Sequence, residues 1–487
     1  MNWKQLMCGV EYKVLACGGE ADITSIEYDS RKLVPGSAFV AVKGTAFDGH
    51  DFVEQAAGRG AVMAVVEHEL PSYPENMTVL CVESTLTAMP MMAINFYDKP
   101  SDDMTMVGVT GTKGKTTTTT LIHRIMMAAG HKAGLIGTIE NKIGEETFPA
   151  QYTTPQAFDL EKLLFRMKNE GVDAVTMEVS SHALALHRVD GMKFDVALFT
   201  NLSLDHLDFH HTMEAYLEAK MELFHRARLG LTNLDSPEGR KVLEAGYCRM
   251  LGYAIDEESA DYRAMNVSMT IHGLEYDLRM PDGKSFHIQY PFPGRFNVYN
   301  TLAASAVCLL LGISPEVIVE ELGRRDRLVR GRFQTVHGPN ELAAIVDYAH
   351  APDALVNVLT TIDEFKTKRV ITIVGCGGDR DRTKRPVMAK VAGEYSDYVI
   401  LTSDNPRTED PYAILAEMEP GIRETGTPYE VIENRRQAIR HAVQIAEPGD
   451  VILIAGKGHE DYQIIGREKT HFDDVEEVEK AFREVHA

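Results

Sequence analysis

The chain has 487 residues, too many for one hydrophobic core, so we expect two to four domains. Its hydrophobic fraction of 44% and charged fraction of 25% are ordinary for a globular protein. Fifty Lys and Arg stand against 72 Asp and Glu, and the net charge of −22 argues against nucleic-acid binding as the main function.

The six cysteines include no Cys-x-x-Cys pair, which is typical of reduced thiols in a cytoplasmic protein. The first residues contain no apolar run of the kind found in signal peptides. The most apolar helix candidate, residues 302–313, is too short to span a bilayer. We therefore expect a cytoplasmic protein without membrane insertion.

Residues 1–99 alternate short apolar runs with a polar helical stretch. Strands are expected at 38–42, 61–66 and 78–82, and a helix at 51–58. The polar runs 28–31 and 44–50 are either simple turns or the rim of a site for an anionic, nucleotide-like ligand. The proline-broken run 98–103 is typical of a linker.

A β-rich run at 105–110 leads into Gly111-Thr112-Lys113-Gly114-Lys115-Thr116-Thr117, and a helix is expected from 115 to 129. This is the order of a phosphate-binding loop. Glycines let the backbone approach phosphates, the helix start attracts anions, a lysine reaches the β- and γ-phosphates, and a Thr hydroxyl takes Mg²⁺. Val109 stands where the usual first glycine lies. The alternative is an ordinary strand–turn–helix corner.

Further strands are expected at 134–139, 173–177 and 194–200, and the run 152–155 is expected to begin a helix. Glu178 follows the second of these strands, and His206 lies in the polar run after the third. Ligands bind beyond the carboxyl ends of strands in open parallel sheets, so both residues could reach the Mg²⁺ that Thr116 binds. A structural hydrogen-bonding role is the alternative.

The helix expected at 212–228 carries Lys220 between two glutamates, a composition typical of a solvated face. β-Hairpins are expected from 268 to 293, before the apolar helix. Asn297 and Asn300 lie three residues apart at its start, where their amides could read a base or ribose, or cap the helix.

Residues 332–487 again alternate strands and helices, with strands expected at 343–346, 369–374, 398–402, 429–432 and 451–455. This predicts a second doubly wound sheet. Polar runs follow four of the strands, at 347–352, 375–381, 403–407 and 456–460. Arginine suits a carboxylate and glutamate suits an ammonium, so the site would fit an amino acid. The alternative is that glycine and asparagine simply form turns.

Together these motifs resemble the Mur ligase family, ATP-dependent enzymes that add amino acids to the peptide of the bacterial cell-wall precursor. The resemblance covers essentially the whole chain and rests on the runs 111–117, 178–182, 201–206, 347–350 and 456–460. It implies an α/β fold of three domains. These are a small N-terminal α/β domain that binds the UDP-linked substrate (1–99), a central ATP-binding domain with a P-loop ATPase-like parallel sheet (100–331), and a Rossmann-like C-terminal domain that binds the amino acid (332–487).

Within the family, Asp404-Asn405-Pro406-Arg407 is similar to the run in members that add meso-2,6-diaminopimelate to UDP-N-acetylmuramoyl-L-alanyl-D-glutamate. Lysine-adding members usually differ there. The resemblance implies three small-molecule substrates (ATP, the UDP-linked dipeptide and diaminopimelate), an acyl phosphate, Mg²⁺ as cofactor, and closure of the third domain over ATP. We expect a monomer without nucleic-acid partners.

The resemblance also assigns residues by position. The residues implied for ATP are Gly111, Thr112, Lys113, Gly114, Lys115, Thr116, Thr117, Asn297, Arg332 and Asp347. Those for the UDP-linked substrate are Ser30, Thr45, Ala46, Phe47, Thr153, Thr154, Ser180 and Arg188. Those for diaminopimelate are Arg380, Asp404, Asn405, Pro406, Arg407, Gly456 and Glu460. The catalytic set is Lys115, Glu178, His206 and Lys220, and the metal set is Thr116, Glu178, His206 and Lys220, the lysine as N6-carboxylysine.

Four other interpretations remain open at this stage. The chain could be a lysine-adding member of the same family or a folylpolyglutamate synthase-like ligase. It could be a nucleotide-dependent switch that performs no ligation. A dinucleotide oxidoreductase would need its glycine fingerprint at 375–379, where the glycine spacing is wrong.

Overall fold

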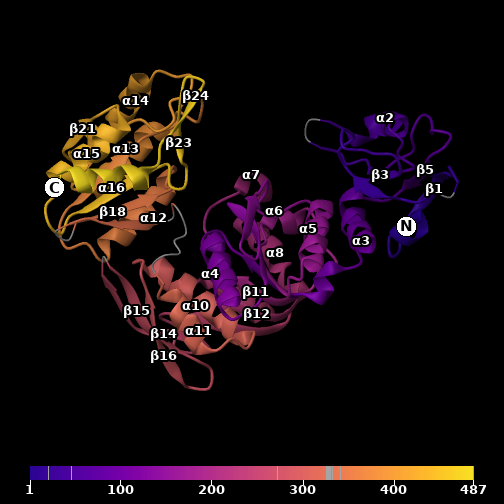
Figure 1. Cartoon of the computed structure of the whole chain (residues 1–487), viewed down its shortest axis with the longest axis horizontal. Coiled ribbons are helices and arrows are strands. Elements are labelled where there is room, and N and C mark those ends of the chain that lie inside the picture. The colour runs from indigo at the N-terminus through magenta and orange to yellow at the C-terminus, as the bar shows by residue number, and fades with distance from the viewer. Residues whose placement is uncertain are drawn as a thin grey trace. The chain divides into compact units, whose positions relative to one another are not determined.

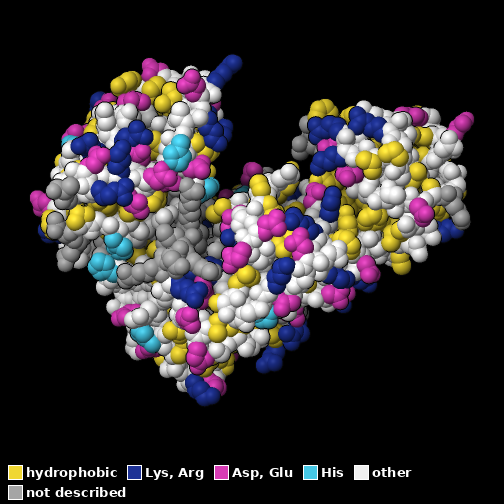
Figure 2. All heavy atoms as spheres, in the orientation of Figure 1, with side chains coloured by type: hydrophobic (Ala, Val, Ile, Leu, Met, Phe, Trp, Pro, Cys, Tyr) yellow, Lys and Arg dark blue, Asp and Glu magenta, His cyan; other side chains and the backbone are white. Residues whose placement is uncertain are grey.

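The computed structural model describes residues 1–19, 21–44, 47–270, 272–324, 331, 333–339 and 342–485 (Figure 1). The chain divides into two compact units. One comprises Met1–Arg263, Arg279–Lys284 and Tyr299–Glu321, and the other Ala264–Leu278, Ser285–Val298 and Leu322–Ala487. None of the described helices is both long and apolar enough to cross a membrane. On the face seen in Figure 2, acidic and basic side chains are interspersed.

The N-terminal sheet has the strand order β1-β5-β4-β3-β2. Strands β2 to β5 are parallel and β1 is an antiparallel edge. Its elements are α1 (Trp3–Leu6), β1 (Lys13–Ala16), β2 (Ser25–Glu27), β3 (Ser37–Val40), η1 (Gly49–Phe52), α2 (Val53–Gly58), β4 (Met63–Val66), β5 (Thr78–Cys81) and α3 (Thr85–Tyr97). The three predicted strands are confirmed within about two residues, because β3 and β4 are continuous buried apolar runs.

The central sheet has the order β16-β15-β14-β13-β12-β11-β6-β10-β7-β8-β9. Its strands are β6 (Thr105–Thr110), β7 (Ala133–Ile136), β8 (Glu140–Ile143), β9 (Glu146–Pro149), β10 (Ala174–Glu178), β11 (Phe194–Phe199), β12 (Ala227–Asn233), β13 (Arg249–Ala254), β14 (Tyr262–Thr270), β15 (Gly273–Arg279) and β16 (Ser285–Tyr290). Strand β6 lies between β10 and β11, parallel to both. The carboxyl ends of these three strands therefore meet at one edge.

The helical elements that go with this sheet are η2 (Pro100–Asp103), α4 (Lys115–Ala128), α5 (Ala157–Asn169), α6 (Ser181–Ala185), α7 (Leu207–His210), α8 (Met213–Met221), η3 (Phe224–Arg226), α9 (Pro237–Ala245), α10 (Arg295–Leu310) and α11 (Pro315–Leu322). Two helix predictions were wrong. The helix expected to begin at 152–155 begins at Ala157, since the threonine hydroxyls there bond elsewhere. The helix expected to reach residue 228 ends at Met221, and β12 follows. The predicted linker forms η2, where Pro100 and Ser101 are buried.

The C-terminal sheet has the order β17-β18-β22-β19-β20-β21. The strands are β17 (Gln334–His337), β18 (Ala343–Asp347), β19 (Val370–Val374), β20 (Tyr398–Leu401), β21 (Tyr429–Val431) and β22 (Val451–Ala455). The helices are α12 (Pro352–Asp363), α13 (Lys384–Tyr395), α14 (Pro411–Thr425), α15 (Arg435–Ile445) and α16 (Asp474–Val485). A separate hairpin comprises β23 (Tyr462–Ile465) and β24 (Glu468–His471).

Two hydrophobic cores cover the two faces of this sheet. One core contains side chains of α12, α13 and α14, and the other contains side chains of α15 and α16. All strands except β17 run parallel. The predicted doubly wound sheet is thus confirmed, and the carboxyl ends of β18, β19, β20 and β22 share one edge.

Candidate functional site

The loop between β6 and α4 requires glycine at two positions. Gly111 has φ 141° and Gly114 has φ 85°. A Cβ at Gly111 would lie 1.9 Å from Thr200 Oγ1, and one at Gly114 would lie 2.6 Å from Asn300 Oδ1. Both the backbone conformation and the surrounding atoms exclude larger residues. The strand–glycine loop–helix prediction is therefore confirmed.

The residues after β11 hold this loop in place. The amide N–H of Thr112 donates to Asn201 O, and that of Lys113 donates to Asn201 Oδ1, both at 2.9 Å. Thr200 Oγ1 donates to Lys113 O at 2.7 Å. Lys115 Nζ donates to Gly111 O at 2.9 Å and to Thr112 O at 3.0 Å. An ammonium thus lies over the loop at a helix N-terminus, where an anion is stabilised.

Lys220 is buried against the same loop, and the prediction that it lies on a solvated helix face was wrong. Only 1% of the residue is exposed, and its Nζ donates to Gly111 O at 2.9 Å. The amine lies 4.3 Å from the centre of the Tyr216 ring, and the Tyr216 hydroxyl is 3.2 Å from Thr112 Oγ1. Burial, followed by the charge of Lys115, holds the pKa of Lys220 well below its ordinary value. A neutral amine is consequently more accessible here than at an exposed lysine.

Glu178 and His206 lie at the carboxyl ends of the two strands that flank β6. The buried carboxylate of Glu178 accepts hydrogen bonds from the amide of Thr138 at 2.8 Å and from its hydroxyl at 3.1 Å. His206 has φ 53°, and its half-exposed ring lies 4.8 Å from the ring of His182. The hydroxyl of Thr116 has no hydrogen-bond partner among the described residues.

This donor set fits a magnesium ion in part. Mg²⁺ prefers oxygen ligands and keeps several waters, and the fixed Glu178 carboxylate and the unpartnered Thr116 hydroxyl meet that preference. The imidazole of His206 is a softer ligand that suits Mg²⁺ less well. Oxygen atoms of bound phosphates would complete such a site.

Sequence reasoning missed two aromatic residues beside this loop. The ring of His210 stacks on Tyr216 with 4.9 Å between ring centres, and its Nε2 lies 2.9 Å from Ser181 Oγ. Burial, followed by the nearby His182, lowers the pKa of His210 to about 4. Tyr216 links His210, Lys220 and Thr112. No spacing in the sequence indicates this packing, because it depends on how α7 and α8 fold back.

The four residues predicted here for the UDP-linked substrate lie together next to Glu178. Thr154 Oγ1 donates to Glu178 O at 2.9 Å and accepts from Ser180 N at 3.1 Å. Arg188 Nη1 donates to Thr154 O at 2.9 Å, and Thr153 Oγ1 lies 3.0 Å from Thr138 Oγ1. Burial lowers the pKa of Arg188, and its buried Nε has no partner among the described residues. A half-buried cation with an unused donor suits an anionic ligand.

Of the N-terminal candidates, Ser30 and Phe47 lie at the surface. Ser30 Oγ donates to Gln55 Oε1 at 3.4 Å, and 75% of Phe47 is exposed. Thr45 and Ala46 lie outside the described residues. The hydroxyl of the neighbouring Tyr28 donates to Asp159 Oδ2 of α5 at 2.6 Å. This contact ties the run 28–31 to the helix that follows Thr153 and Thr154.

A cluster of Asp48, His50 and His68 in the N-terminal part of the chain has metal-ligating atoms within 4.8 Å of one another. The ring of His50 is already satisfied by protein groups. Its Nδ1 lies 2.5 Å from Asp48 Oδ1, and its Nε2 accepts from Glu67 N at 2.8 Å. We therefore interpret this cluster as a structural contact.

Two of the predicted ATP residues lie in the second compact unit. Asn297 Nδ2 donates to Pro293 O at 2.9 Å, and Asp347 Oδ2 accepts from Phe333 N at 2.7 Å. Both side chains are buried. Arg332 lies outside the described residues. Helix α10 begins at Arg295, so neither Asn297 nor Asn300 caps it.

The residues predicted for the amino acid meet at the carboxyl ends of β19, β20 and β22. Asn405 Nδ2 donates to Glu460 Oε2 at 2.8 Å, and Asn405 Oδ1 accepts from Lys457 Nζ at 3.0 Å. A Cβ at Gly456, where φ is 118°, would lie 2.7 Å from Asp404 Oδ2. Arg407 Nη1 donates to Gly378 O at 2.7 Å. Pro406 is buried, and Arg380 is exposed in the loop that follows β19.

Lys457 is a further residue that sequence reasoning missed. It is fully buried, and it also donates to Tyr462 O at 2.7 Å. Burial lowers its pKa, although the carboxylates of Asp404 and Glu460 oppose that effect. Its contact with Oδ1 fixes the amide of Asn405 so that the N–H₂ group faces Glu460.

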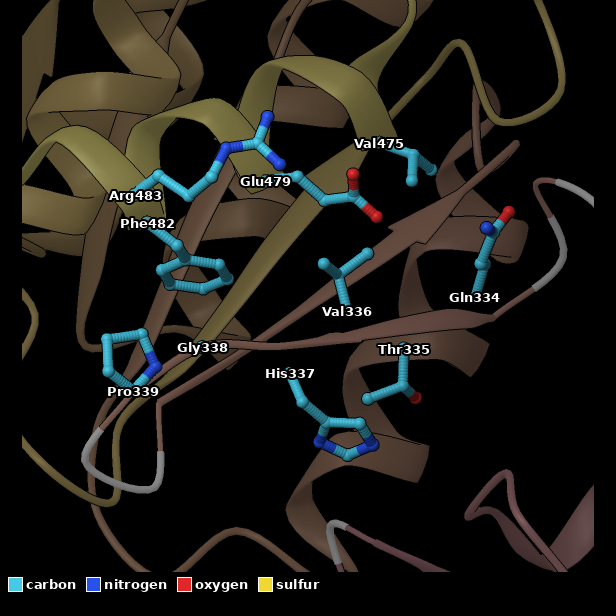
Figure 3. Close-up of a pocket in the computed structure, with 10 residues that line it drawn as sticks. All are labelled: Gln334, Thr335, Val336, His337, Gly338, Pro339, Val475, Glu479, Phe482 and Arg483. Carbon is cyan, nitrogen blue, oxygen red and sulfur yellow. The ribbon is translucent and has the colours of Figure 1, made fainter. Parts of the chain in front are cut away.

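A cavity of about 650 Å³ lies elsewhere, along the edge strand β17 and helix α16. Figure 3 shows Val336 and Phe482 on one side of the strand, with His337 and Thr335 pointing to the other. None of the predicted site residues that the structure describes lines it. Its lining is Gln334, Thr335, Val336, His337, Gly338, Pro339, Val475, Glu479, Phe482 and Arg483.

Three family models match the chain. They are the Mur ligase family catalytic domain at residues 22–97, the Mur ligase middle domain at 109–308, and the Mur ligase glutamate ligase domain at 331–458. Two curated relatives both carry the name UDP-N-acetylmuramoyl-L-alanyl-D-glutamate–2,6-diaminopimelate ligase. The protein from Caldanaerobacter subterraneus subsp. tengcongensis is 43% identical over 99% of both chains. The protein from Geobacillus thermodenitrificans is 46% identical over 96% of both.

A solved structure of a UDP-N-acetylmuramoyl-L-alanyl-D-glutamate–2,6-diaminopimelate ligase is 33% identical to this chain. It superposes with a TM-score of 0.75 over 96% of both chains. A MurF ligase from Thermotoga maritima in complex with ADP is 20% identical, with a TM-score of 0.58 over 95% of this chain and 97% of that one. That second likeness bears on the fold alone.

Proposed function

The chain belongs to the Mur ligase family, and we propose on this basis that it is an ATP-dependent ligase that adds meso-2,6-diaminopimelate to UDP-N-acetylmuramoyl-L-alanyl-D-glutamate. The bond formed is an amide to the γ-carboxylate of the D-glutamyl residue, in peptidoglycan precursor synthesis. The relatives named above support the substrates. The observation that carries the assignment is the meeting of a guanidinium, an amide and a carboxylate at one sheet edge, on Arg407, Asn405 and Glu460.

The chemical problem is that a carboxylate is a poor electrophile. An oxygen of the γ-carboxylate attacks the γ-phosphorus of ATP, the bond from that phosphorus to the bridging oxygen breaks, and ADP leaves. The product is an acyl phosphate. The amine of diaminopimelate then attacks the acyl carbon and loses a proton, and inorganic phosphate leaves with the electrons of the carbon–oxygen bond.

The loop at 111–114 and the N-terminus of α4 bind the phosphates of ATP. Lys115 and the loop amides stabilise the charge on the phosphoryl group as it moves, which is the main task in phosphoryl transfer. A magnesium ion, held by Thr116 and Glu178 with His206 and a carboxylated Lys220 nearby, would supply further positive charge at the phosphates. The family resemblance also assigns Asn297, Arg332 and Asp347 to nucleotide binding.

Arg188, Thr153, Thr154 and Ser180 bind the UDP-linked substrate next to Glu178, with Ser30 and residues 45–47 on the uridine side. This grouping is supported by the hydrogen bonds that join Thr154 to Glu178, Ser180 and Arg188. The substrates are small molecules, and we propose that the enzyme works in the cytoplasm as a monomer. Holding two anions and an amine together is mainly a positioning task.

An isotope experiment tests the proposed chemistry. The γ-carboxylate of the UDP-linked dipeptide is labelled with ¹⁸O, and the products with ATP and diaminopimelate are analysed by mass spectrometry. Through an acyl phosphate, one ¹⁸O atom appears in the released phosphate. The tripeptide product keeps the other, so its mass is that of the labelled dipeptide plus diaminopimelate less H₂¹⁸O. Unlabelled phosphate alongside that product would exclude the acyl phosphate. Absence of the product would exclude the ligase.

A further inference from the structure

Two adjacent loops carry the arginines of the amino-acid site. One loop follows β19 and contains Arg380, and the other follows β20 and contains Arg407. Each loop has a non-glycine residue in the left-handed region, Asp379 with φ 53° and Arg407 with φ 51°. This conformation costs about 1 kcal/mol or more per residue and persists only where surrounding contacts impose it.

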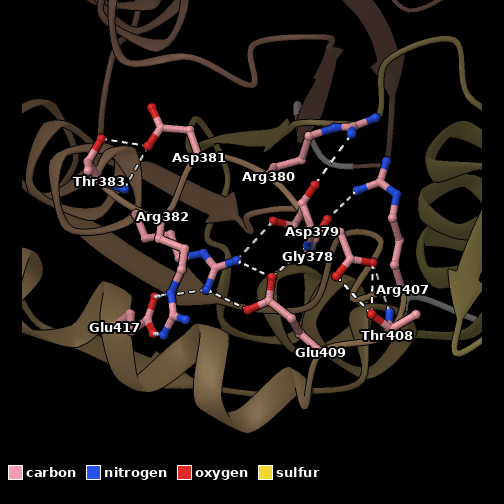
Figure 4. A network of polar contacts seen from close by, with 12 residues as sticks. Gly378, Asp379, Arg380, Asp381, Arg382, Thr383, Arg407, Thr408, Glu409 and Glu417 are labelled. Carbon is pink, nitrogen blue, oxygen red and sulfur yellow. Dashed lines mark hydrogen bonds and ion pairs between the residues drawn. The ribbon is translucent and has the colours of Figure 1, made fainter.

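The contacts that impose it at Asp379 come from the other loop. Asp379 N donates to Glu409 Oε1 at 2.5 Å. The Asp379 carboxylate accepts from Thr408 Oγ1 at 2.8 Å and from Thr408 N at 3.2 Å. Gly378 N donates to Asn405 O at 2.9 Å. Figure 4 shows this network joining the two loops, with the guanidinium groups of Arg380 and Arg407 on the same side of it.

Arg385 anchors the network from inside the domain. The residue is fully buried, and its Nη1 and Nη2 donate to the two carboxylate oxygens of Glu409 at 2.9 and 2.8 Å. Nη1 also donates to Glu417 Oε2 of α14 at 2.8 Å. The bidentate pair fixes Glu409 so that one oxygen meets the amide of Asp379. The hydrogen bonds from Arg385 lower the pKa of Glu409 to about 2, so the carboxylate stays ionised across the working pH range.

Arg407 is held on both sides of its backbone. Its N–H donates to Ile464 O at 3.1 Å, and its carbonyl accepts from Gly466 N at 2.7 Å, both in the β23–β24 hairpin. Its side chain donates to Gly378 O at 2.7 Å, in the first loop. A shift of that loop would therefore move the carbonyl that orients the Arg407 guanidinium, together with Arg380.

We propose that Thr408, Asp379, Glu409 and Arg385 are positioning residues that set the relation between the Arg380 and Arg407 guanidinium groups, and so select an amino acid with a second carboxylate. This inference rests on the proposed function. A substrate with two carboxylates uses both arginines, whereas lysine has only one carboxylate. Loosening the network therefore penalises diaminopimelate more than lysine.

The test compares steady-state kinetics of Glu409→Gln, Thr408→Val and Thr408→Ser with those of the unmodified chain. We expect Glu409→Gln to raise the KM for diaminopimelate about tenfold or more, with the KM for ATP and for the UDP-linked dipeptide within about twofold. Thr408→Val should raise the KM for diaminopimelate about threefold to tenfold. Thr408→Ser keeps the hydroxyl and should therefore leave this KM at the value of the unmodified chain. The ratio of kcat/KM for diaminopimelate to kcat/KM for L-lysine should fall by the same factor as the KM for diaminopimelate rises.

Asp450→Asn is the matched control, because Asp450 is likewise a carboxylate paired with an arginine in the same domain but lies at the opposite ends of the strands. It accepts from Arg369 Nη2 at 2.6 Å and from Arg369 N at 3.1 Å. This variant should lower the Tm and leave the KM for diaminopimelate unchanged. Equal shifts for all three substrates, or an unchanged KM in Glu409→Gln, would overturn the inference. Inactivity of the unmodified chain with diaminopimelate would instead overturn the proposed function, and the inference with it.

Discussion

The side chain of Arg407 has N–H donors that no described protein group accepts. Among the described residues its guanidinium donates only to Gly378 O, at 2.7 Å. A guanidinium has five N–H donors, and a carboxylate binds two of them in parallel. Lysine lacks the second carboxylate of diaminopimelate, so a site shaped for that group leaves the remaining N–H donors of Arg407 without an acceptor when lysine binds.

Arg407→Ala should therefore raise the KM for diaminopimelate by about tenfold to a hundredfold, which is the loss of affinity expected when a pair of charge-assisted hydrogen bonds is removed. The KM for ATP should stay within about twofold, because Arg407 is not among the residues proposed to bind the nucleotide. Arg382→Ala is the control, since Arg382 lies in the neighbouring loop, two residues after Arg380, and its guanidinium pairs with Glu417 at the surface. Steady-state kinetics with each substrate varied decides it. Equal effects on ATP and diaminopimelate would refute the assignment.

Glu161 is a buried carboxyl that forms no ion pair with the part of the chain that the structure describes. Its Oε2 has no hydrogen-bond partner among the described residues. Burial, with a smaller contribution from Asp102, raises its pKa from an ordinary 4.5 to about 8. The folded state thus holds this proton more tightly than the unfolded state. Between about pH 4.5 and 8 the group therefore costs stability progressively as pH rises.

Glu161→Gln removes that cost, because glutamine does not titrate. Relative to the unmodified chain, the variant should gain about 2–4 kcal/mol of unfolding free energy between pH 5 and pH 8.5. Urea unfolding at both pH values measures the gain, with the exposed Glu145→Gln as control. A difference between variant and unmodified chain that does not change with pH would contradict the buried, protonated state.

At the scale of elements, the glycine loop after β6 combines a special backbone conformation with close packing. Gly111→Ala places a Cβ 1.9 Å from Thr200 Oγ1 at φ 141°. We expect ATP turnover to fall at least about a hundredfold, since displacement of the loop by about 1 Å spoils phosphate positioning.

Gly130→Ala is the matched control, because it also has positive φ, 94°, but has nothing within 4 Å of the added carbon. It should lower the Tm by a few degrees, about 1 kcal/mol, without loss of turnover. Comparable losses of turnover in both variants would show that backbone strain alone, rather than the loop, is responsible.

Helices α15 and α16 are joined by ion pairs that differ in burial. Arg435 and Asp474 are fully buried, with contacts of 2.7 and 2.8 Å, whereas Arg436 and Glu477 form a pair at the surface. Asp474→Asn leaves a buried guanidinium unpaired and should cost about 3–5 kcal/mol. Glu477→Gln should cost under about 1 kcal/mol. Thermal unfolding of both variants measures the difference, and equal costs would contradict it.

The elements that could be predicted from sequence are those whose local pattern agrees with their surroundings. Strands β6, β19 and β22 are apolar runs bounded by turn residues, and each appears within one residue of its predicted ends. Strand β12 was missed because no glycine or proline separates it from α8. The β23–β24 hairpin was missed as well, although it holds the backbone of Arg407.

The candidate site could be predicted in its strand-end motifs but not in its packing. Glu178 ends the buried strand β10, whereas Asn405 and Gly456 follow the buried strands β20 and β22, and the parallel pairing brings each to the carboxyl edge of its own sheet. From sequence, Lys220 is predicted to be exposed because the residues around it are charged, yet in the structure its amine is buried and donates to Gly111 O. Arg385 and Lys457 are likewise buried cations that only tertiary contacts identify.

At the scale of the whole molecule, an acidic chain places single cations at the candidate ligand sites. The chain carries a net charge of −22 and is proposed to act on anionic substrates. Its cations at the candidate sites are therefore local, with Lys115 on the glycine loop, Arg188 beside Glu178, and Arg407 at the end of β20. Each lies at the carboxyl edge of a parallel sheet, where α/β proteins bind ligands.

The central claim is a ligation that needs ATP, the UDP-linked dipeptide and diaminopimelate together. The most direct measurement is release of inorganic phosphate from ATP with UDP-N-acetylmuramoyl-L-alanyl-D-glutamate present, comparing meso-diaminopimelate with L-lysine. We predict release with diaminopimelate and little with lysine. Release with lysine instead would keep the ligation and contradict the specificity assigned to Arg407. No release with either amine would contradict the proposed function itself.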